Sequence, residues 1–590
     1  MKIIIVGAGI SGCAVYLQLR KHLPKPPSGE AHKITIYEAY DTNVDTTSDD
    51  RGYGPTHSST LIVGGGLGVA ANGLGVLQRL DEDLLRDIVR DGYSCATMNM
   101  KSKSGKVLAR MQPAGKPALD GQGQDTMNTV ACSRHALWRQ LRRRIPDDVI
   151  VTKRVSEVVA RSDGLNVVSF VDGSPSAEAD LVIGADGLKG LAKKAIFAGD
   201  GDGDTTDPFP PHYEGLCGVG GFVPFSLVKD HVEIGSMNFV MGGNGFFGYF
   251  IAESAPDAPH RDSAHHVSPP GESVGWWSTY SVDKCPDPKS VRKEDILEQL
   301  RLRHRDWDDP VIRKVLETSK VTCMYPTWVV PPLPTWERDG VVLVGDAAHA
   351  LPSTSGQGAS QALEDVECFA LFLSHHLGEA YESNAGDSID HKYIIKTAAK
   401  QYLHLRQPRV KGILDHAQNW QDCKRDKTVI EEYIMYAWMW AIGRASPGSS
   451  RAHSTLICAS QELYDYPRTQ LFPHSNFLGG GHVISRTSVP LTGYTAGLGP
   501  SGGVAPSWTT THGNSLSRGS VVPCRPLVGK LVVLKIHSIV LRDFSRESWG
   551  APGLLVRGRE EDRCAATAVR RRRWHYHGRI HVRSLCLDEI

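Results

Sequence analysis

The stretch KIIIVGAGISG, residues 2–12, decides the fold of this chain. Its first five residues are rich in β-branched side chains, as in a buried parallel strand. In the glycine pattern that follows, Gly7 permits a tight turn, Gly9 lets the backbone approach a pyrophosphate, and Gly12 lets a helix pack on the strand. The first turn of that helix would offer free N–H groups to phosphates. The stretch therefore predicts the dinucleotide-binding turn of a doubly wound α/β fold.

A second strand is expected over residues 34–38, and it ends at Glu38. A carboxylate at this position can accept hydrogen bonds from both hydroxyls of a nucleotide ribose. Its distance from the glycines exceeds the usual spacing of about 20 residues, and a loop rich in Pro, Gly and Ser over residues 24–29 accounts for the excess. The glycines and Glu38 predict a site for FAD or NAD, and this part of the chain does not decide between them.

The composition excludes several classes of protein. Of the 590 residues, 41% are apolar and 22% charged, as in globular proteins. The 66 basic and 65 acidic side chains leave no global charge for binding nucleic acid or an anionic membrane. None of the 12 cysteines forms a C-x-x-C pair, so no metal site is expected. The strand at residue 2 argues against a leader peptide, and no apolar run reaches the roughly 18 residues of a stable membrane span, so we expect a cytoplasmic protein.

A second glycine motif follows another expected strand at residues 341–344. It reads GDAAH over 345–349, GQGA over 356–359 and QALED over 361–365. This order resembles the second FAD motif of the single-component flavoprotein monooxygenases, the salicylate-hydroxylase-like (group A) family. The resemblance implies that Asp346 bonds a ribityl hydroxyl and that the turn at Gly358 and Ala359 lies against the isoalloxazine. A helix that begins at this turn would stabilise the negative charge of reduced flavin. The motif therefore favours FAD as the bound dinucleotide.

Three further segments match in the family's order, and together the resemblance covers roughly residues 1–445. DLVIGADG, residues 180–187, resembles a motif attributed to contact with FAD and the nicotinamide cofactor, which implies a binding role for Asp186. SRHAL, residues 133–137, resembles the helix whose arginine contacts the flavin, which implies this role for Arg134. GGGL, residues 64–67, resembles the segment beside the isoalloxazine, which implies that Gly64 and Gly65 lie there.

Two departures from the family pattern bear on catalysis. Gly190 and Lys193 occupy positions where the family commonly has a serine and an arginine. Lys193 keeps the positive charge without the planar fork of an arginine, and we name it as the candidate catalytic residue, with a surface lysine as the alternative. Residues 218–221, GVGG, replace a Tyr-Arg-Gly of the first substrate-lobe strand, so a catalytic tyrosine has no support.

The resemblance implies a doubly wound FAD-binding lobe with an inserted β-rich substrate lobe and C-terminal helices. We place the first part of the FAD-binding lobe at 1–204, with 85–125 partly in the substrate lobe. The substrate lobe is placed at 205–325, the second part of the FAD-binding lobe at 326–375, and the C-terminal helices at 376–445. Residues 446–590 lack apolar periodicity, so we expect a disordered tail that contributes neither FAD binding nor chemistry.

The activity implied by the resemblance is that of an FAD-dependent monooxygenase. NADPH or NADH would reduce the flavin, and a flavin C4a-hydroperoxide would hydroxylate or epoxidise an electron-rich aromatic or alkene small molecule. The resemblance also fits an enzyme of fungal secondary metabolism, with an aromatic or a polyketide- or terpenoid-like substrate. A reductase or halogenase of the same superfamily and a catalytically inactive FAD-binding protein are the alternatives. The sequence predicts no oligomeric state.

The sequence favours structural roles for three histidines. We expect His349 to stabilise the turn of the second motif, with proton transfer as the alternative. We expect His375 and His376 to lie at the solvated end of the helix that follows it.

Overall fold

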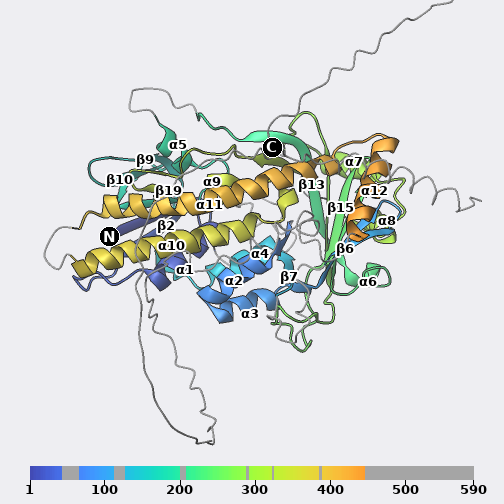
Figure 1. Ribbon diagram of the computed structural model, residues 1–590, viewed down its shortest axis with the longest axis horizontal. Helices are drawn as coiled ribbons and strands as arrows, with labels where there is room; N and C mark the ends of the chain where they lie inside the picture. Colours follow the sequence, from blue (N-terminus) through green and yellow to red (C-terminus); the bar gives the residue numbers. More distant parts are fainter. Residues whose placement is uncertain are drawn as a thin grey trace, which may run out of the picture. The chain divides into compact units, whose positions relative to one another are not determined.

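A six-stranded sheet forms the centre of the part of the chain that carries the glycine motifs (Figure 1). The computed structural model describes residues 1–42, 65–111, 127–198, 207–287, 291–319, 321, 324–383 and 389–444. The strand order is β18 (Glu337–Arg338), β19 (Val341–Leu343), β12 (Leu181–Gly184), β1 (Lys2–Val6), β2 (Lys33–Glu38) and β8 (Ile150–Thr152). Every neighbouring pair is parallel except β18 with β19. The predicted α/β class is confirmed.

Helices cover this sheet and bury its apolar side chains. α1 (Ile10–His22) packs on α10 (Gly358–Ser383), which packs on α11 (His391–Gln421), and Figure 1 shows the two long helices side by side. The remaining helices around this sheet are α2 (Ala71–Leu80), α3 (Glu82–Arg90), α4 (Arg134–Arg142), α5 (Leu191–Phe197) and α9 (Asp346–His349). Burial of the branched β1 side chains from Ile3 to Val6 stabilises the centre.

Two small sheets join the segments between these elements. One contains β11 (Ala177–Ala179), β10 (Asn166–Phe170) and β9 (Val155–Val159). The other contains β3 (Gly66–Val69), β7 (Thr129–Ser133) and β4 (Tyr93–Cys95). In the second sheet β3 pairs with β7 so that Gly66 lies opposite Ser133. This pairing brings the segment at Gly65 to the start of α4.

A seven-stranded sheet is built from three separate parts of the chain. Its order is β17 (Met324–Val329), β13 (His212–Pro224), β16 (Ser273–Ser281), β15 (Gly245–Ile251), β14 (Ser236–Gly242), β5 (Thr97–Ser102) and β6 (Val107–Met111). Its neighbouring strands are antiparallel except for β14 with β5. The short helix α6 (Phe225–Val228) follows β13.

The two faces of this sheet pack against different helices because side chains alternate along each strand. On one face Phe247 and Tyr249 belong to a core that includes α7 (Lys293–Arg303) and α8 (Pro310–Thr318). On the other face Phe246 packs with Met435 and Met439 of α12 (Val429–Arg444). Phe250 and Trp277 share this second face, which we call the aromatic face.

Some expectations from the sequence are not decided by the fold. Gly64 and the tail at 446–590 lie outside the described residues, and the domain boundaries stay a prediction. All described residues belong to one unit of the chain, Met1–Ser488. Within the described ranges, no helix has the length and apolar character needed to cross a membrane.

Candidate functional site

The carboxyl ends of four parallel strands bring both glycine motifs to one edge of the six-stranded sheet. β1 leads into Gly7, β2 ends at Glu38, β12 leads toward Asp186, and β19 leads toward Asp346. In this sheet β1 lies between β2 and β12. The strand order therefore reverses at β1, directly beside the first glycine motif. Open α/β sheets bind ligands in the crevice at such a point. Residues more than 300 positions apart are therefore assembled at one site.

The first glycine turn packs tightly against the protein at Gly7 and Gly12, and it is open at Gly9. Gly7 has φ of +101°, and a Cβ there would stand 2.6 Å from the carbonyl oxygen of Ala185. A Cβ at Gly12 would overlap the carbonyl oxygen of Gly7, so α1 packs directly on the turn. A Cβ at Gly9 would meet nothing within 4 Å. Gly9 begins α1 without a side-chain cap, which leaves backbone N–H groups available for an anion.

Glu38 makes contacts within the protein that the sequence did not predict. Its Oε2 accepts a hydrogen bond of 2.7 Å from the Ala8 N–H, and its Oε1 accepts one of 3.1 Å from the Tyr40 N–H. The Ala8 carbonyl in turn accepts a 2.8 Å bond from Trp138 Nε1. Each carboxylate oxygen keeps further acceptor capacity, so ribose binding by Glu38 stays a prediction. Glu38 and Trp138 together fix the orientation of the Ala8 peptide groups.

The second motif touches the first. A Cβ on Gly345 would overlap Ser11 Oγ, so the loop after β19 lies against the first turn of α1. Asp346 opens α9 with its side chain exposed, and its carboxylate has no hydrogen-bond partner within the described part of the chain. An unengaged carboxylate beside an uncapped helix start suits a ligand that offers hydroxyl groups and a pyrophosphate.

The residues assigned to the isoalloxazine end also meet. The Arg134 N–H donates a 2.8 Å bond to the Gly65 carbonyl. The Ala70 N–H donates to Ser360 Oγ at 3.2 Å, which ties the same segment to the first turn of α10, where Gly358 and Ala359 lie half-buried. The half-buried Arg134 guanidinium has no partner among the described residues. Gly65, Arg134, Gly358 and Ala359 thus lie in one neighbourhood, and their contact with flavin stays a prediction.

Asp186 caps a helix and keeps one oxygen unpaired. Its Oδ2 accepts bonds of 2.6 Å and 3.0 Å from the N–H groups of Leu191 and Ala192, at the start of α5. Its Oδ1 is buried with no partner in the described ranges. Burial raises the pKa of this carboxyl group. A buried acceptor without a partner in the protein can accept a hydrogen bond from a ligand hydroxyl, and FAD offers such hydroxyls, so Asp186 fits this cofactor.

The Asp186 side chain also explains one departure from the family pattern. A Cβ at Gly190 would overlap Asp186 Oδ1. A serine at this position therefore does not fit beside the carboxylate as it stands.

Lys193 lies inside the protein, so the alternative of a surface lysine is wrong. The residue is 1% exposed. Its Nζ pairs with Asp207 Oδ2 at 2.7 Å and donates a 2.7 Å bond to the Phe209 carbonyl. An ammonium engaged by two oxygens holds the chain near Asp207 against α5. The catalytic role of Lys193 stays a prediction, and this geometry supports a structural role.

We expect Lys193→Met to lower the free energy of unfolding by about 1–3 kcal/mol, because Asp207 loses its cation and Phe209 its donor. Turnover per bound FAD should stay unchanged. The exposed neighbour Lys194 provides the matched control, as Lys194→Met should leave both quantities unchanged. Urea unfolding and flavin-normalised NAD(P)H oxidation measure the two effects. A large loss of turnover in folded, FAD-loaded Lys193→Met would return Lys193 to the catalytic residues.

A buried ionic cluster that no sequence motif indicates holds the second motif on α10 and α11. Asp365 Oδ2 accepts bonds from the Gly345 N–H at 3.1 Å and contacts His349 Nε2 at 2.5 Å. Its Oδ1 accepts a 2.9 Å bond from Arg406 Nε. Burial raises the pKa of Asp365, but the charges of His349 and Arg406 outweigh it and hold the pKa below its usual range. His349 therefore stabilises the turn, as predicted.

Glu364 extends this cluster toward the isoalloxazine end. It accepts hydrogen bonds from Arg406 and two bonds of 2.6 Å from Arg409. Its Oε1 also accepts from Asn72 Nδ2 at 2.5 Å. Burial raises the pKa of Glu364, and the two guanidinium groups lower it below its usual range. The cluster thereby links α2, α10 and α11 behind the cofactor site.

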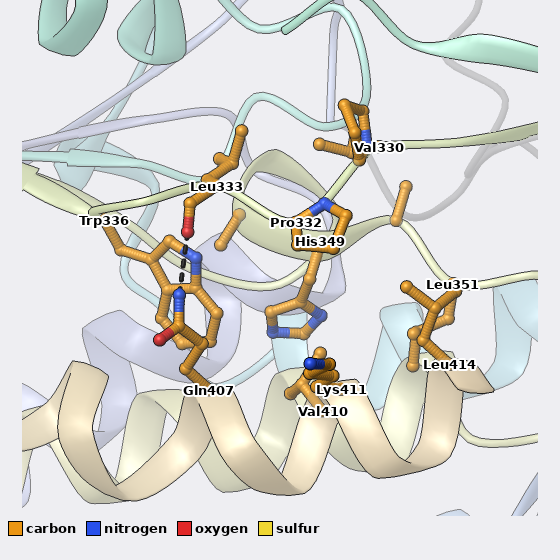
Figure 2. A pocket seen from close by; sticks show the side chains of 13 residues that line it. Val330, Pro332, Leu333, Trp336, His349, Leu351, Gln407, Val410, Lys411 and Leu414 are labelled. Carbon is orange, nitrogen blue, oxygen red and sulfur yellow. Dashed lines mark hydrogen bonds between the residues drawn. The ribbon is translucent and has the colours of Figure 1, made fainter. Parts of the chain in front are cut away.

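Figure 2 shows a small cavity on the other side of His349. Its volume is about 30 Å³, room for one water. Gln407 closes one end by donating a 2.7 Å bond to the Leu333 carbonyl. His349 Nδ1 is buried without a partner in the described ranges. The cavity is too small for an aromatic substrate, so it belongs to the support of the second motif.

The aromatic face of the seven-stranded sheet lies next to the cofactor site. A Cβ on Gly66 would overlap the Phe250 ring, which places β3 against this face. Phe250 and Trp277 have ring centroids 5.8 Å apart, and Trp277 and Phe246 5.6 Å. Trp277 and its neighbour Phe239 are partly exposed. The face therefore offers aromatic surface that begins beside Gly66.

Phe250, Trp277 and Phe246 form a row along the aromatic face, and Lys424 lies at the end of this row that is far from Gly66. No sequence motif predicted a role for Lys424. The residue is 5% exposed, and its Nζ lies 4.6 Å from the centroid of the Phe246 ring. Within the described residues no carboxylate pairs with it. Burial lowers the pKa of Lys424 to about 7. A buried ammonium without an anion costs stability, and such groups are enriched at functional sites, so Lys424 is a candidate functional residue.

We expect Lys424→Met to raise the free energy of unfolding at pH 6 by on the order of 2–4 kcal/mol. Below pH 7 the folded chain carries the buried charge at full cost. Between pH 7 and the unfolded value of 10.5 the unfolded state binds more protons, so the wild-type chain gains stability as pH rises. The difference in the free energy of unfolding between Lys424→Met and the wild type should therefore shrink over this range. Urea unfolding at pH 6 and pH 9 measures it, and an equal gain at both values contradicts the assignment.

Comparisons with known proteins support an FAD-binding chain. A family described as "FAD binding domain" matches residues 284–399. The chain is 25% identical over 417 residues to zeaxanthin epoxidase of Nicotiana plumbaginifolia, covering 70% of this chain and 53% of the relative. It is 25% identical over 390 residues to salicylate hydroxylase of Pseudomonas putida, covering 64% and 77%. The chain thus spans about half the length of the zeaxanthin epoxidases that it matches.

Solved structures share the fold. HpxO of Klebsiella pneumoniae, complexed with FAD and uric acid, aligns with a TM-score of 0.54 at 18% identity, covering 77% of this chain and 96% of that chain. CtdE in complex with FAD and a substrate aligns with a TM-score of 0.52 at 16% identity, covering 72% and 89%.

Proposed function

We propose that this chain, which belongs to the group A family of FAD-dependent monooxygenases, uses NADPH or NADH and O2 to hydroxylate or epoxidise an electron-rich small molecule. One observation carries the proposal. Two uncapped glycine turns, the carboxylates of Glu38 and Asp346, and the unpaired Arg134 guanidinium meet at one edge of the sheet, beside an aromatic face. Bound FAD supplies hydride acceptance and activation of O2.

The chain's own groups provide binding, orientation and electrostatics. The start of α1 directs N–H groups toward a pyrophosphate, and Asp346 accepts from a ribityl hydroxyl. The start of α10, at Gly358 and Ala359, presents its positive dipole end to the flavin and stabilises negative charge there. Arg134 adds a full positive charge in the same neighbourhood. Gly64, Gly65 and Asp186 complete the proposed cofactor-binding set.

The aromatic face supports an aromatic or alkene substrate. Phe239 and Trp277 provide ring surface for stacking, and Lys424 at the far end of the row suits an acidic or hydrogen-bond-accepting group. We propose that the substrate is a polyketide- or terpenoid-like molecule. We also propose that the protein acts in the cytoplasm. Salicylate hydroxylase and zeaxanthin epoxidase bear names of an aromatic and a polyene substrate, which accords with this class.

The test uses the purified full-length chain with bound FAD. A library of aromatic and polyene small molecules is screened for compounds that accelerate NADPH or NADH oxidation. Each active compound is then turned over under ¹⁸O2, and the product is analysed by mass spectrometry. We expect one labelled oxygen atom per product molecule.

Each alternative predicts a different outcome. A reductase forms product without label and without O2. A halogenase requires halide. An inactive FAD-binding protein retains yellow flavin and shows no compound-dependent NAD(P)H oxidation. Any of these three results overturns the monooxygenase proposal.

A further inference from the structure

Two histidines and a glutamate gather on the last turns of α10. His375 and His376 were expected at a solvated helix end, but α10 continues to Ser383 and their side chains are only 22% and 17% exposed. His375 Nε2 lies 3.3 Å from Glu379 Oε1, and His376 Nδ1 lies 3.2 Å from Glu379 Oε2. The three ligand atoms lie within 4.8 Å of one another.

Two of these separations are close to those between the ligands of a zinc-class ion. Zn²⁺ binds imidazole nitrogen and carboxylate oxygen at about 2.0–2.2 Å in a tetrahedron, which places neighbouring ligand atoms about 3.3 Å apart. The contact of His375 with Oε1 of Glu379 and that of His376 with Oε2 are close to this length, and all three ligand atoms lie within 4.8 Å of one another, so small side-chain rotations would complete the set around an ion. Two imidazoles and one carboxylate are a donor set that Zn²⁺, Co²⁺ and Ni²⁺ accept and that Mg²⁺ disfavours. One position would remain for water.

A fourth residue orients the set from the neighbouring helix. The other ring nitrogen of His376, Nε2, lies 2.9 Å from Gln401 Oε1 of α11. A metal-bound histidine usually donates its second N–H to such an oxygen, which fixes its tautomer. With Nε2–H donating to Gln401, Nδ1 of His376 is the lone-pair nitrogen and faces Glu379.

We propose that His375, His376 and Glu379 bind one zinc-class divalent cation, with Gln401 as the outer hydrogen-bond partner. The cation would fasten the end of α10 to α11 through Gln401. His375 lies 17 residues from the start of α10 at Gly358, roughly 26 Å along the helix axis. The site therefore serves stability and not the flavin reaction. It does not depend on the proposed function.

The test titrates the metal-free, reduced full-length chain with Zn²⁺ in a calorimeter and with Co²⁺ in a spectrophotometer. We expect one saturable equivalent, and a Co²⁺ spectrum of nitrogen and oxygen ligation without thiolate bands. His376→Ala and Glu379→Gln should each weaken binding at least about tenfold, and Gln401→Ala by about 10–100-fold. His404→Ala, an exposed histidine of α11, is the matched control and should bind as the wild type does.

Flavin content and circular dichroism confirm that each variant is folded, because the site is remote from the cofactor. A Zn²⁺-induced rise in melting temperature should appear in the wild-type chain and in His404→Ala, and vanish in His376→Ala. No saturable equivalent, thiolate bands, or binding that survives His376→Ala and Glu379→Gln together would each overturn the proposal.

Discussion

Replacing Arg406 by leucine is expected to lower the free energy of unfolding by about 3–5 kcal/mol. Arg406 is 3% exposed and bonds Asp365, Glu364 and the side chain of Gln361. Leucine fills much of its volume but leaves two buried carboxylates with less compensating charge. Removing one partner of a buried ionic cluster costs far more than the pair contributes when intact.

The dependence on pH gives this prediction a second readout. In the wild-type chain the pKa values of Asp365 and Glu364 are lowered, so their contribution to stability is present above the unfolded values and is lost as pH falls through the folded values. Without Arg406 both pKa values rise, and protonation relieves the variant as pH falls. The deficit should therefore be larger at pH 7 than at pH 4.5.

Urea unfolding of the full chain at the two pH values measures the effect. Lys411→Leu, an exposed cation on the same helix, is the control and should change the free energy of unfolding by less than about 0.5 kcal/mol. A deficit in Arg406→Leu below about 1 kcal/mol, or one that grows toward low pH, contradicts the role assigned to the cluster.

Glu38→Ala is expected to weaken FAD binding by about 2–4 kcal/mol, which is roughly a 30- to 700-fold rise in Kd. Two losses contribute. The ribose hydroxyls lose a charged acceptor, and the Ala8 N–H loses the 2.7 Å bond that orients the glycine turn. AMP and ADP-ribose share the adenosine ribose and a phosphate with FAD. The variant should therefore also bind these two ligands more weakly.

Flavin fluorescence during titration of the apoprotein measures Kd. Glu30→Ala, an exposed carboxylate in the loop before β2, is the control and should bind FAD as the wild type does. Asp346→Ala should weaken FAD binding but leave AMP binding unchanged, which separates the two ends of the cofactor. Full retention of yellow flavin by Glu38→Ala and Asp346→Ala after gel filtration would contradict both assignments.

The features that local sequence predicted well are those that depend on neighbouring residues. A branched run followed by GAGISG specifies a strand, a turn with positive φ at Gly7 and a helix start, because each requirement is met within eleven residues. The same holds for GDAAH at 345–349. The family resemblance then supplied the cofactor and the class of reaction, which the geometry of the cofactor edge supports.

The features that only the folded chain decided are long-range pairings of charge and surface. Arg406 lies 41 residues from Asp365, and Asp207 lies 14 residues from Lys193. The periodicity of a single helix or strand therefore predicts neither pair. Lys424 is an ordinary lysine in the sequence, and only its burial over Phe246 gives it a lowered pKa. His375 and His376 gain their outer partner from a separate helix. A side chain's environment is set by what the tertiary structure places around it, and the free energy of a charge depends on that environment more than on the residue type.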